Sequence, residues 1–371
     1  MSEIKTFLIL GHRRWARLFA EELCSRVKPN TKIYLIGNPR NNELKRWLQN
    51  SGLISRIIIS KKIVNIDKKK LAVAFVVNSA YMHEFCVKDL LCRGYNVVCE
   101  KPISFSRNRT VKLINLAEKK KLNLFCTNTY SFASYLTKLK DGFLKKKYSD
   151  IFVTWTDPKK EIRYNQIKGY DSSVPIIYDI LPHVANILYI IIGNFKLRLK
   201  NLDIKNGGSK VIIHYQQKKI NITIRLERNA AKRKRFIKFI SKKSQLNFDF
   251  TKEPGLIKKN NNSQFKIDRR WSIRSRPISI MINSVICFFE LGKKDSRLNL
   301  ITSLLGNELI DAVAKKYVDN QIKLLKHQKK YSLRSVVYGL KEFNSIKERT
   351  LEFINKNSTL YSLVKNKKNK W

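Results

Sequence analysis

The first 130 residues alternate short apolar runs with stretches in which apolar residues recur at helical spacing. A short apolar run is typical of a strand buried on both faces, and the helical spacing predicts an amphipathic helix between two such strands. Strands are predicted at Thr6 to Leu10, Lys32 to Ile36, Arg56 to Ile59, Ala72 to Val77, Asn96 to Cys99 and Asn123 to Cys126. Helices are predicted at Arg14 to Val27, Asn42 to Gln49, His83 to Cys92 and Arg109 to Lys120. This order predicts an α/β domain with a doubly wound parallel sheet, whose ligand site lies beyond the carboxyl ends of the strands.

After about residue 150 the predicted strands follow one another closely and are joined by short polar turns. Several alternate with a period of two, as in Ile220, Ile222, Ile224 and Leu226, which favours antiparallel pairing. Strands are predicted at Ile151 to Trp155, Lys210 to Tyr215, Lys219 to Leu226, Phe236 to Ile240 and Gln245 to Phe250. Helices are predicted at Pro175 to Ile192, Ile278 to Leu291 and Leu300 to Tyr317, and a long polar loop at Lys258 to Arg276. The second domain is therefore predicted to be α+β, with an open, mainly antiparallel sheet and helices on one face.

Composition narrows the class of protein. The 371 residues include 76 Lys plus Arg against 28 Asp plus Glu, a net charge of +48, and 43% of them are hydrophobic. An intrinsically disordered chain is excluded, because disorder needs a high net charge together with few apolar residues. The basic residues are dispersed along the chain, so the charge predicts non-specific, salt-sensitive binding to nucleic acid.

Cysteine usage and hydropathy bear on the compartment. The six cysteines lie mostly inside apolar runs, with no Cys-x-x-Cys pair and no His at ligand spacing. They are expected to be free thiols in a reducing compartment, and no metal site is predicted. The N-terminus lacks the features of a signal peptide, and no apolar stretch is long and uninterrupted enough to span a membrane. A cytoplasmic location without membrane contact is therefore expected.

The turn after the first strand, Gly11 to Ala16, keeps the first glycine of the G-x-G-x-x-G pattern found in dinucleotide-binding folds. Arg13 stands in place of the second glycine and Ala16 in place of the third. On these residues alone, a plain strand-to-helix turn fits as well as a pyrophosphate site. The free N–H groups of a helix start and the charges of Arg13 and Arg14 favour an anion there.

The end of the second strand bears on the choice of cofactor. An acidic residue here would bind the adenosine ribose of NAD, but none occurs before Glu43. Asn38 and Arg40 suit a 2′-phosphate instead, so NADP(H) is expected in preference to NAD(H). The alternative is that Asn38 and Pro39 only form a turn.

Two further motifs carry side chains suited to catalysis. Glu100, Lys101 and Pro102 follow the fifth strand, and Asp179 and His183 lie four residues apart on one side of an apolar helix. Reduction of a carbonyl places negative charge on oxygen, so it needs a cationic donor and a proton source that titrates near neutral pH. Taken alone, the helical pair would also fit a polar residue on a buried helix beside a hydrogen-bonded core histidine.

With these motifs the sequence resembles the glucose–fructose oxidoreductase, inositol dehydrogenase and rhizopine-catabolism family (Gfo/Idh/MocA). The matching positions keep their order and spacing over roughly residues 5 to 320. They are Gly11 with Arg14 to Ala16, Asn78 to His83 after the fourth strand, Glu100 to Pro102, and Asp179 with His183. The combined order of four motifs is more specific than any one of them.

The resemblance implies an NAD(P)-dependent oxidoreductase. Lys101 would lie beside the nicotinamide and hydrogen-bond the substrate oxygen, and His183 would be the general acid or base. Asp179 would hold substrate hydroxyls and set the state of His183, and Pro102 is commonly a cis proline in relatives. The cofactor-binding residues would be Gly11, Arg13, Arg14, Trp15, Asn38, Arg40, Asn78, His83, Glu100 and Pro102. His83 fits equally well as a cap of the following helix.

Three regions and one leading function follow. Residues 1–130 are predicted to be a Rossmann-type dinucleotide-binding domain, residues 131–325 a substrate-binding and dimerisation domain, and residues 326–371 a basic helical extension and tail. The leading function is hydride transfer to or from a hydroxyl or carbonyl carbon of a sugar, nucleotide-sugar or cyclitol. Alternatives are reduction of a C=N bond in a specialised metabolite, a cofactor-weak non-catalytic relative, and a polyanion-binding protein. A homo-oligomer, either a dimer or a tetramer, is expected.

Overall fold

The computed structural model describes residues 6–38, 40–63, 72–144, 148–163, 166–170, 174–260, 264–272 and 275–327. Contacts divide the chain into two compact units. The first unit comprises residues 1–133 and 272–307, and the second comprises residues 134–271 and 308–371. The predicted C-terminal extension lies outside the described residues, apart from the end of a helix that reaches His327.

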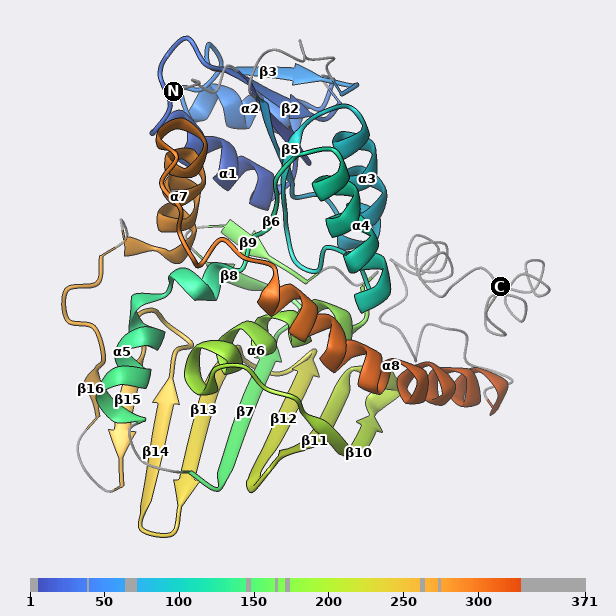
Figure 1. Ribbon diagram of the computed structural model, residues 1–371, viewed down its shortest axis with the longest axis vertical. Helices are drawn as coiled ribbons and strands as arrows, with labels where there is room; N and C mark the ends of the chain where they lie inside the picture. Colours follow the sequence, from blue (N-terminus) through green and yellow to red (C-terminus); the bar gives the residue numbers. More distant parts are fainter. Residues whose placement is uncertain are drawn as a thin grey trace. The chain divides into compact units, whose positions relative to one another are not determined.

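The first unit is built on a six-stranded sheet in which every pairing is parallel (Figure 1). Its strands are β1 (Thr6–Leu10), β2 (Lys32–Ile36), β3 (Ile57–Ser60), β4 (Ala72–Val76), β5 (Asn96–Cys99) and β6 (Leu124–Cys126). The order β3-β2-β1-β4-β5-β6 reverses between β1 and β4, which are neighbours. This is the doubly wound Rossmann-type fold, and its ligand crevice lies beyond the carboxyl ends of β1 and β4.

Helices cover both faces of this sheet, which explains why its strands are apolar without alternation. They are α1 (Arg14–Cys24), α2 (Asn42–Asn50), α3 (His83–Cys92), α4 (Arg107–Lys119) and α7 (Pro277–Leu291). One core cluster packs α1, α2 and α7 against the sheet, and a second packs α3 and α4 against the opposite face. Although α7 is distant in sequence, Ser279 near its start donates a hydrogen bond to Glu22 of α1 at 2.7 Å.

The second unit is built on an eight-stranded sheet in which only β7 and β12 pair in parallel. The strands, in the order β10-β11-β12-β7-β13-β14-β15-β16, are β10 (Arg198–Lys205), β11 (Lys210–Gln217), β12 (Ile220–Arg228), β7 (Asp150–Asp157), β13 (Lys234–Ser241), β14 (Ser244–Asp249), β15 (Leu256–Lys259) and β16 (Phe265–Lys266). A separate hairpin pairs β8 (Glu161–Arg163) with β9 (Gln166–Lys168). The predicted open, mainly antiparallel sheet is confirmed.

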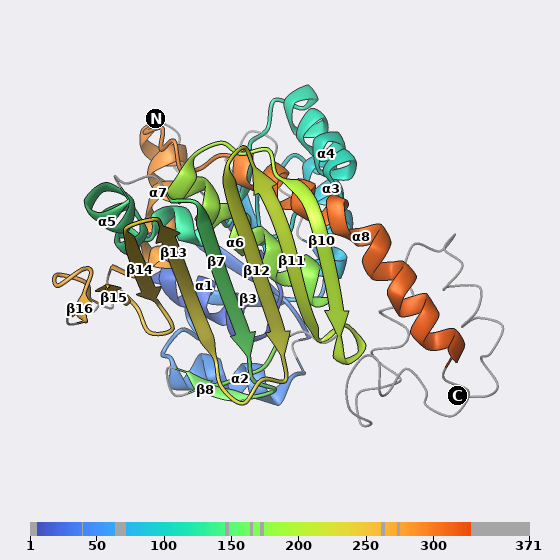
Figure 2. The same ribbon diagram turned by 90° about the horizontal axis from the view of Figure 1, so that it is seen from below.

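Helices of the second unit pack on one face of its sheet (Figure 2). They are α5 (Ser134–Phe143), α6 (Ile176–Ile192) and the part of α8 (Ile301–His327) that follows Asn307. Here α6 contacts β12, and α5 contacts α6. Tyr215 of β11 donates its hydroxyl to the carbonyl of Leu309 at 2.9 Å, which places α8 over that strand. The alternate apolar residues of β7, β11, β12 and β13 supply the core beneath these helices.

Several elements were not predicted from the sequence, and polarity explains most of them. The predicted loop at Lys258 to Arg276 was wrong at its start, where it includes the end of β15 and all of β16. These strands, like β10, lie at or near a sheet edge, where solvent-facing polar residues hide the alternating pattern.

No helix among the described ranges is long and apolar enough to cross a membrane.

Candidate active site

Gly11 shapes the turn at the carboxyl end of β1. Its φ of +138° is unfavourable for residues with a side chain, and a Cβ atom there would lie 3.1 Å from the carbonyl oxygen of Val77. The same Cβ would lie 3.3 Å from the Cβ of Ala16 in α1. The glycine therefore lets β1, the end of β4 and the start of α1 approach closely, as the first glycine of a dinucleotide-binding turn does.

The start of α1 faces this turn with an uncapped end. Arg13 is the N-cap residue, with extended backbone and an exposed side chain, and it makes no side-chain capping hydrogen bond. No acidic residue lies in the first turn of α1. Backbone N–H groups at such a start bind anions. Trp15 packs its ring edge-on against Phe19 at a centroid distance of 5.7 Å, so it is part of the core packing under α1.

The turn after β2 presents Arg40 to solvent. The side-chain oxygen of Asn38 accepts a hydrogen bond from the backbone N–H of Arg40 at 3.1 Å, so Asn38 shapes the turn. Glu43, the first acidic residue after β2, is 2.9 Å from the guanidinium of Arg17 on α1. Arg17 also donates to the carbonyl of His12 at 3.1 Å. Sequence reasoning did not predict this role of Arg17, which forms an ion pair with Glu43, the acidic residue nearest the turn.

His83 joins two loops at the carboxyl edge of the sheet. Its Nδ1 is 2.8 Å from the carbonyl oxygen of Pro102, and its Nε2 is 3.3 Å from that of Asn78. The side chain is 1% exposed, and burial lowers its pKa from 6.5 to about 4, with a further lowering by the charge of Lys101. The ring therefore lies between the loop after β4 and the loop after β5, and in its neutral form it donates its single N–H to one of the two carbonyls.

The loop after β5 carries Lys101. The Lys101–Pro102 peptide bond is cis, as the resemblance implied. The backbone N–H of Glu100 donates to the carbonyl of Val76 at 2.8 Å, and its carboxylate accepts a hydrogen bond from the hydroxyl of Thr127. Lys101 itself is only 9% exposed, less than expected for a lysine at the end of a central strand. The loop is thus tied to the ends of both neighbouring strands, β4 and β6.

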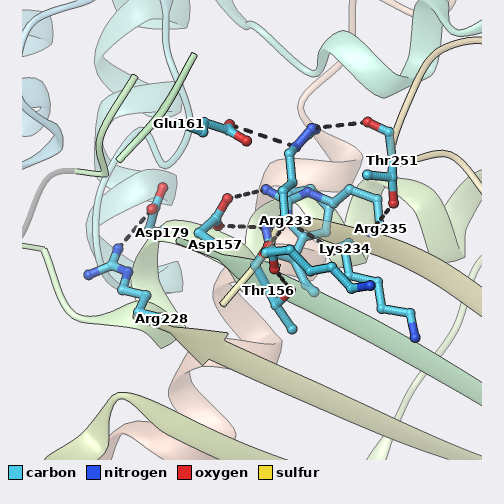
Figure 3. A network of polar contacts seen from close by, with 11 residues as sticks. Thr156, Asp157, Glu161, Asp179, Arg228, Arg233, Lys234, Arg235 and Thr251 are labelled. Carbon is cyan, nitrogen blue, oxygen red and sulfur yellow. Dashed lines mark hydrogen bonds and ion pairs between the residues drawn. The ribbon is translucent and has the colours of Figure 1, made fainter. Parts of the chain in front are cut away.

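In the second unit, Asp179 and His183 lie on α6 at one end of the sheet. Arg228, the last residue of β12, donates from Nη2 to the Asp179 carboxylate at 2.8 Å (Figure 3). It also donates from Nη1 to the carbonyl of Val174 at 2.5 Å. The side chain of Arg228 is fully buried, whereas that of Asp179 is 29% exposed. The guanidinium therefore stabilises Asp179 as a carboxylate while leaving part of it open to solvent.

His183 stacks on Trp155 of β7. The two ring centroids are 5.2 Å apart, and the ring planes differ by 12°. Asp157, two residues after Trp155, accepts from the indole N–H at 3.1 Å and from Arg235 at 2.5 Å (Figure 3 shows the Asp157–Arg235 pair). Beside this pair, Arg233 contacts both Glu161 and the carbonyl of Thr251. Three ion pairs, Arg228–Asp179, Arg235–Asp157 and Arg233–Glu161, therefore lie near this end of the sheet in the described part of the chain.

Sequence reasoning missed Arg228 and Arg235, although a signal was present. Alternate residues of β12 point inward and are buried, and Arg228 continues that row after Leu226. Arg235 likewise begins the inward row of β13 that continues with Ile237. A charged residue that continues an apolar inward row must find a buried partner, so it marks a polar site within a core.

The model of an oxidoreductase family with an NAD-binding Rossmann fold, Gfo/Idh/MocA, matches residues 16–128. No curated protein matches the chain. The match therefore falls on the first unit, where the Gly11 turn and the loop of Lys101 lie.

Solved structures similar to this chain cover most of its length. A 3-ketoreductase from Actinomadura kijaniata, solved with NADP and TDP-benzene, is 16% identical with a TM-score of 0.65 over 85% of this chain and 98% of its own. A UDP-N-acetylglucosamine 3-dehydrogenase from Acidithiobacillus ferrooxidans is 12% identical with a TM-score of 0.64, over 87% and 100%. Biliverdin reductase from Synechocystis, solved with biliverdin and NADP+, is 13% identical with a TM-score of 0.62, over 84% and 98%. At these identities the likeness concerns the fold.

The family match and the fold agree on the first unit. Its doubly wound parallel sheet confirms the prediction from the pattern of apolar runs and helices, and its cis Lys101–Pro102 bond is the one that the resemblance implied. The match to the model of the Gfo/Idh/MocA oxidoreductases, over residues 16–128, thus falls on a unit that has the Rossmann-type fold of that model.

Proposed function

We propose that the protein transfers hydride between NADP(H) and a hydroxyl or carbonyl carbon of a sugar, nucleotide-sugar or cyclitol. The observation that carries this proposal is the site at the end of the second unit's sheet. There Asp179 is held by Arg228 and His183 is stacked on Trp155, so a hydrogen-bond acceptor and a proton-transfer group occupy one helix in defined positions. Both are half-buried, which leaves them open to a ligand.

The residues of the first unit fit a dinucleotide. Only a residue without Cβ fits at Gly11, and the uncapped start of α1 offers N–H groups to a pyrophosphate. Arg13 and Arg14 add positive charge at this start. Arg40 is exposed at the turn after β2, where a guanidinium would bind the 2′-phosphate of NADP(H). When bound, the nicotinamide supplies or accepts the hydride.

The chain's own residues then supply the remaining steps. Lys101 donates a hydrogen bond to the reacting oxygen and stabilises negative charge on it. His183 gives a proton to that oxygen during reduction, or removes one during oxidation. Asp179, held by its hydrogen bond with Arg228, accepts hydrogen bonds from substrate hydroxyls. His83 and Thr127 hold the loop of Lys101 in place.

A binding titration followed by a substrate screen tests this proposal. NADPH and NADH are titrated by nucleotide fluorescence, and sugars, nucleotide-sugars and cyclitols are then screened in both directions by absorbance of the reduced nucleotide. His183→Gln is expected to abolish most of the turnover while leaving NADPH affinity close to that of the parent. His214→Gln is the matched control, because His214 lies on β11 and bonds Thr223 at 3.1 Å.

The outcomes separate the alternatives. If neither NADPH nor NADH binds, the proposal of an active oxidoreductase is contradicted and a cofactor-weak relative is favoured. Turnover that is confined to compounds with a C=N bond would replace the carbonyl by an imine as the reacting group.

We also propose a homodimer through the outer face of the second unit's sheet, where Phe152 is 37% exposed. A concentration-independent monomer mass by light scattering would contradict it.

A further inference from the structure

Trp155 is the last apolar residue of an inward-facing row on β7. Ile151, Val153 and Trp155 are all buried, and Trp155 is 4% exposed. Its indole is the largest side chain of this row and lies at the end of the strand, where α6 places His183. A buried indole N–H needs a hydrogen-bond acceptor, which a purely apolar side chain at this position would not need, and Asp157 supplies it.

The indole is held from two sides by one ion pair. Asp157 accepts the indole N–H at Oδ2 and a guanidinium N–H of Arg235 at Oδ1. Arg235 is the register partner of Trp155 on β13, and its guanidinium carbon is 3.8 Å from the indole centroid. Arg235 also donates to the carbonyl of Thr156 at 2.7 Å, and it is only 2% exposed. A guanidinium that is buried and makes several hydrogen bonds has one conformation, so it also fixes the conformation of the indole that it contacts.

The imidazole of His183 lies nearly parallel to this indole. A centroid separation of 5.2 Å with ring planes 12° apart is within the range of offset-stacked aromatic pairs, which attract each other beyond the effect of burial. Because χ2 of histidine is broad, contact with a fixed flat ring narrows the orientations that the imidazole can take. The stack restricts the ring to one plane.

We propose that Trp155, locked by Asp157 and Arg235, is the positioning residue for His183 and sets the orientation of its proton-transfer nitrogen. The inference rests on the role proposed above for His183. Proton transfer needs the donor nitrogen within hydrogen-bond reach of the reacting oxygen, and a displacement of about 1 Å can cost about 100-fold in rate.

The test compares Trp155→Leu, which removes the stack, with Trp155→Phe, which keeps a smaller flat ring but loses the bond to Asp157. Trp47→Phe is the matched control, because Trp47 also donates its indole N–H to a carboxylate, Glu21, at 2.8 Å. NMR signals of the His183 ring in 13C-histidine protein are assigned by their loss in His183→Gln. Their chemical shifts report the ring current of the indole, and their relaxation reports ring mobility.

In Trp155→Leu, the His183 signals are expected to lose the ring-current shift and to show greater mobility, while the signals of the other histidines stay in place. Trp155→Phe is expected to give smaller changes in the same direction, and it carries the test if Trp155→Leu does not fold. Trp47→Phe should change none of the His183 signals. Unchanged shifts and relaxation in both Trp155 variants would overturn the proposal.

Turnover supplies a second reading. With any substrate whose reduction is lost in His183→Gln, Trp155→Leu is expected to lower kcat about 10- to 100-fold while KM changes less. If the His183 signals respond but kcat does not, the stack is not a positioning device and the inference fails. If His183→Gln retains full turnover, the proposed function fails instead, and the NMR measurement still decides whether Trp155 orders His183.

Discussion

Arg228 donates a hydrogen bond to Asp179 at 2.8 Å, from a side chain that has no exposure to solvent. A buried guanidinium keeps its charge, so the carboxylate beside it is required to neutralise it. Under the proposed function Asp179 has two tasks, because it neutralises Arg228 and its exposed part would accept hydrogen bonds from substrate hydroxyls. Its replacement is expected to affect both stability and substrate binding.

Asp179→Ala is expected to lower the free energy of unfolding by about 1 to 3 kcal/mol, because it leaves a buried charged donor without its acceptor. It should also raise KM for a polyhydroxylated substrate. Asp179→Asn keeps an acceptor oxygen and should cost less stability. Urea denaturation measures the first effect, and Asp203→Ala is the control, because the Asp203–Lys205 pair is largely exposed. Equal stabilities of Asp179→Ala and the parent would contradict the assignment.

Lys101→Ala is expected to lower turnover by about 10²- to 10⁴-fold, the range for loss of a positioned acid–base or donor group. NADPH affinity and the unfolding midpoint should change much less, because Lys101 lies in a loop at the end of β5 and not within a strand. Lys112→Ala, on the exposed side of α4, is the control. Steady-state kinetics measures turnover, and thermal denaturation measures the unfolding midpoint. Near-normal turnover of Lys101→Ala would show that the lysine is structural.

Arg40→Ala is expected to weaken NADPH binding about 10- to 100-fold and to leave NADH binding nearly unchanged. The reason is that a charge-assisted hydrogen bond to the 2′-phosphate is lost, and such bonds contribute about 1.5 to 3 kcal/mol. Arg46→Ala is the matched control, since Arg46 is exposed on α2. Fluorescence titration with both nucleotides measures the difference. Equal weakening of NADPH and NADH would remove the basis for a preference.

His83 should make stability depend on pH. Its pKa is lowered from 6.5 to about 4 in the folded protein, so above pH 6.5 the imidazole is neutral in both states and the stability is fully present. As the pH falls from 6.5 toward 4, the unfolded chain takes up a proton that the folded chain does not. The free energy of unfolding should then fall by about 1.4 kcal/mol per pH unit, about 3 kcal/mol in all.

Urea denaturation across this pH window tests the role of His83. His83→Gln should lack that part of the slope, whereas His214→Gln should retain it. If the slopes of the parent and His83→Gln coincide, His83 is not the buried neutral group that ties Asn78 to Pro102.

Thiol reactivity should divide the cysteines by burial. Cys92 is exposed and should react quickly with a disulfide reagent in the native protein. Burial raises the pKa of Cys126 to about 12 and that of Cys99 well above its usual range, so these two should react only on unfolding. Six thiols should be counted after denaturation without reductant, because all six cysteines are free. Cys92→Ser should remove the fast phase.

The alternation of apolar runs and helical spacing was enough to predict strands β1 to β6 and helices α1 to α4 of the first unit. The run at Ala72 to Val77 became the fully buried β4, and the spacing from His83 to Cys92 became α3 with the same bounds. These patterns are local, because the period of burial follows from the element's own geometry. The same logic predicted α6, and with it the shared side of Asp179 and His183.

The tertiary structure alone decided what those residues meet. Pairing of β13 with β7 sets Arg235 beside Trp155, and the parallel pairing of β12 with β7 brings Arg228 level with Asp157. Strand register depends on contacts between segments far apart in the chain, which no local period encodes. Likewise, the position of His83 in sequence predicted the start of a helix, but only folding shows that its ring bonds to Pro102. The proposed site therefore depends on the buried charges of Arg228 and Arg235, and the pairing of β12 and β13 with β7 determines which residues these charges contact.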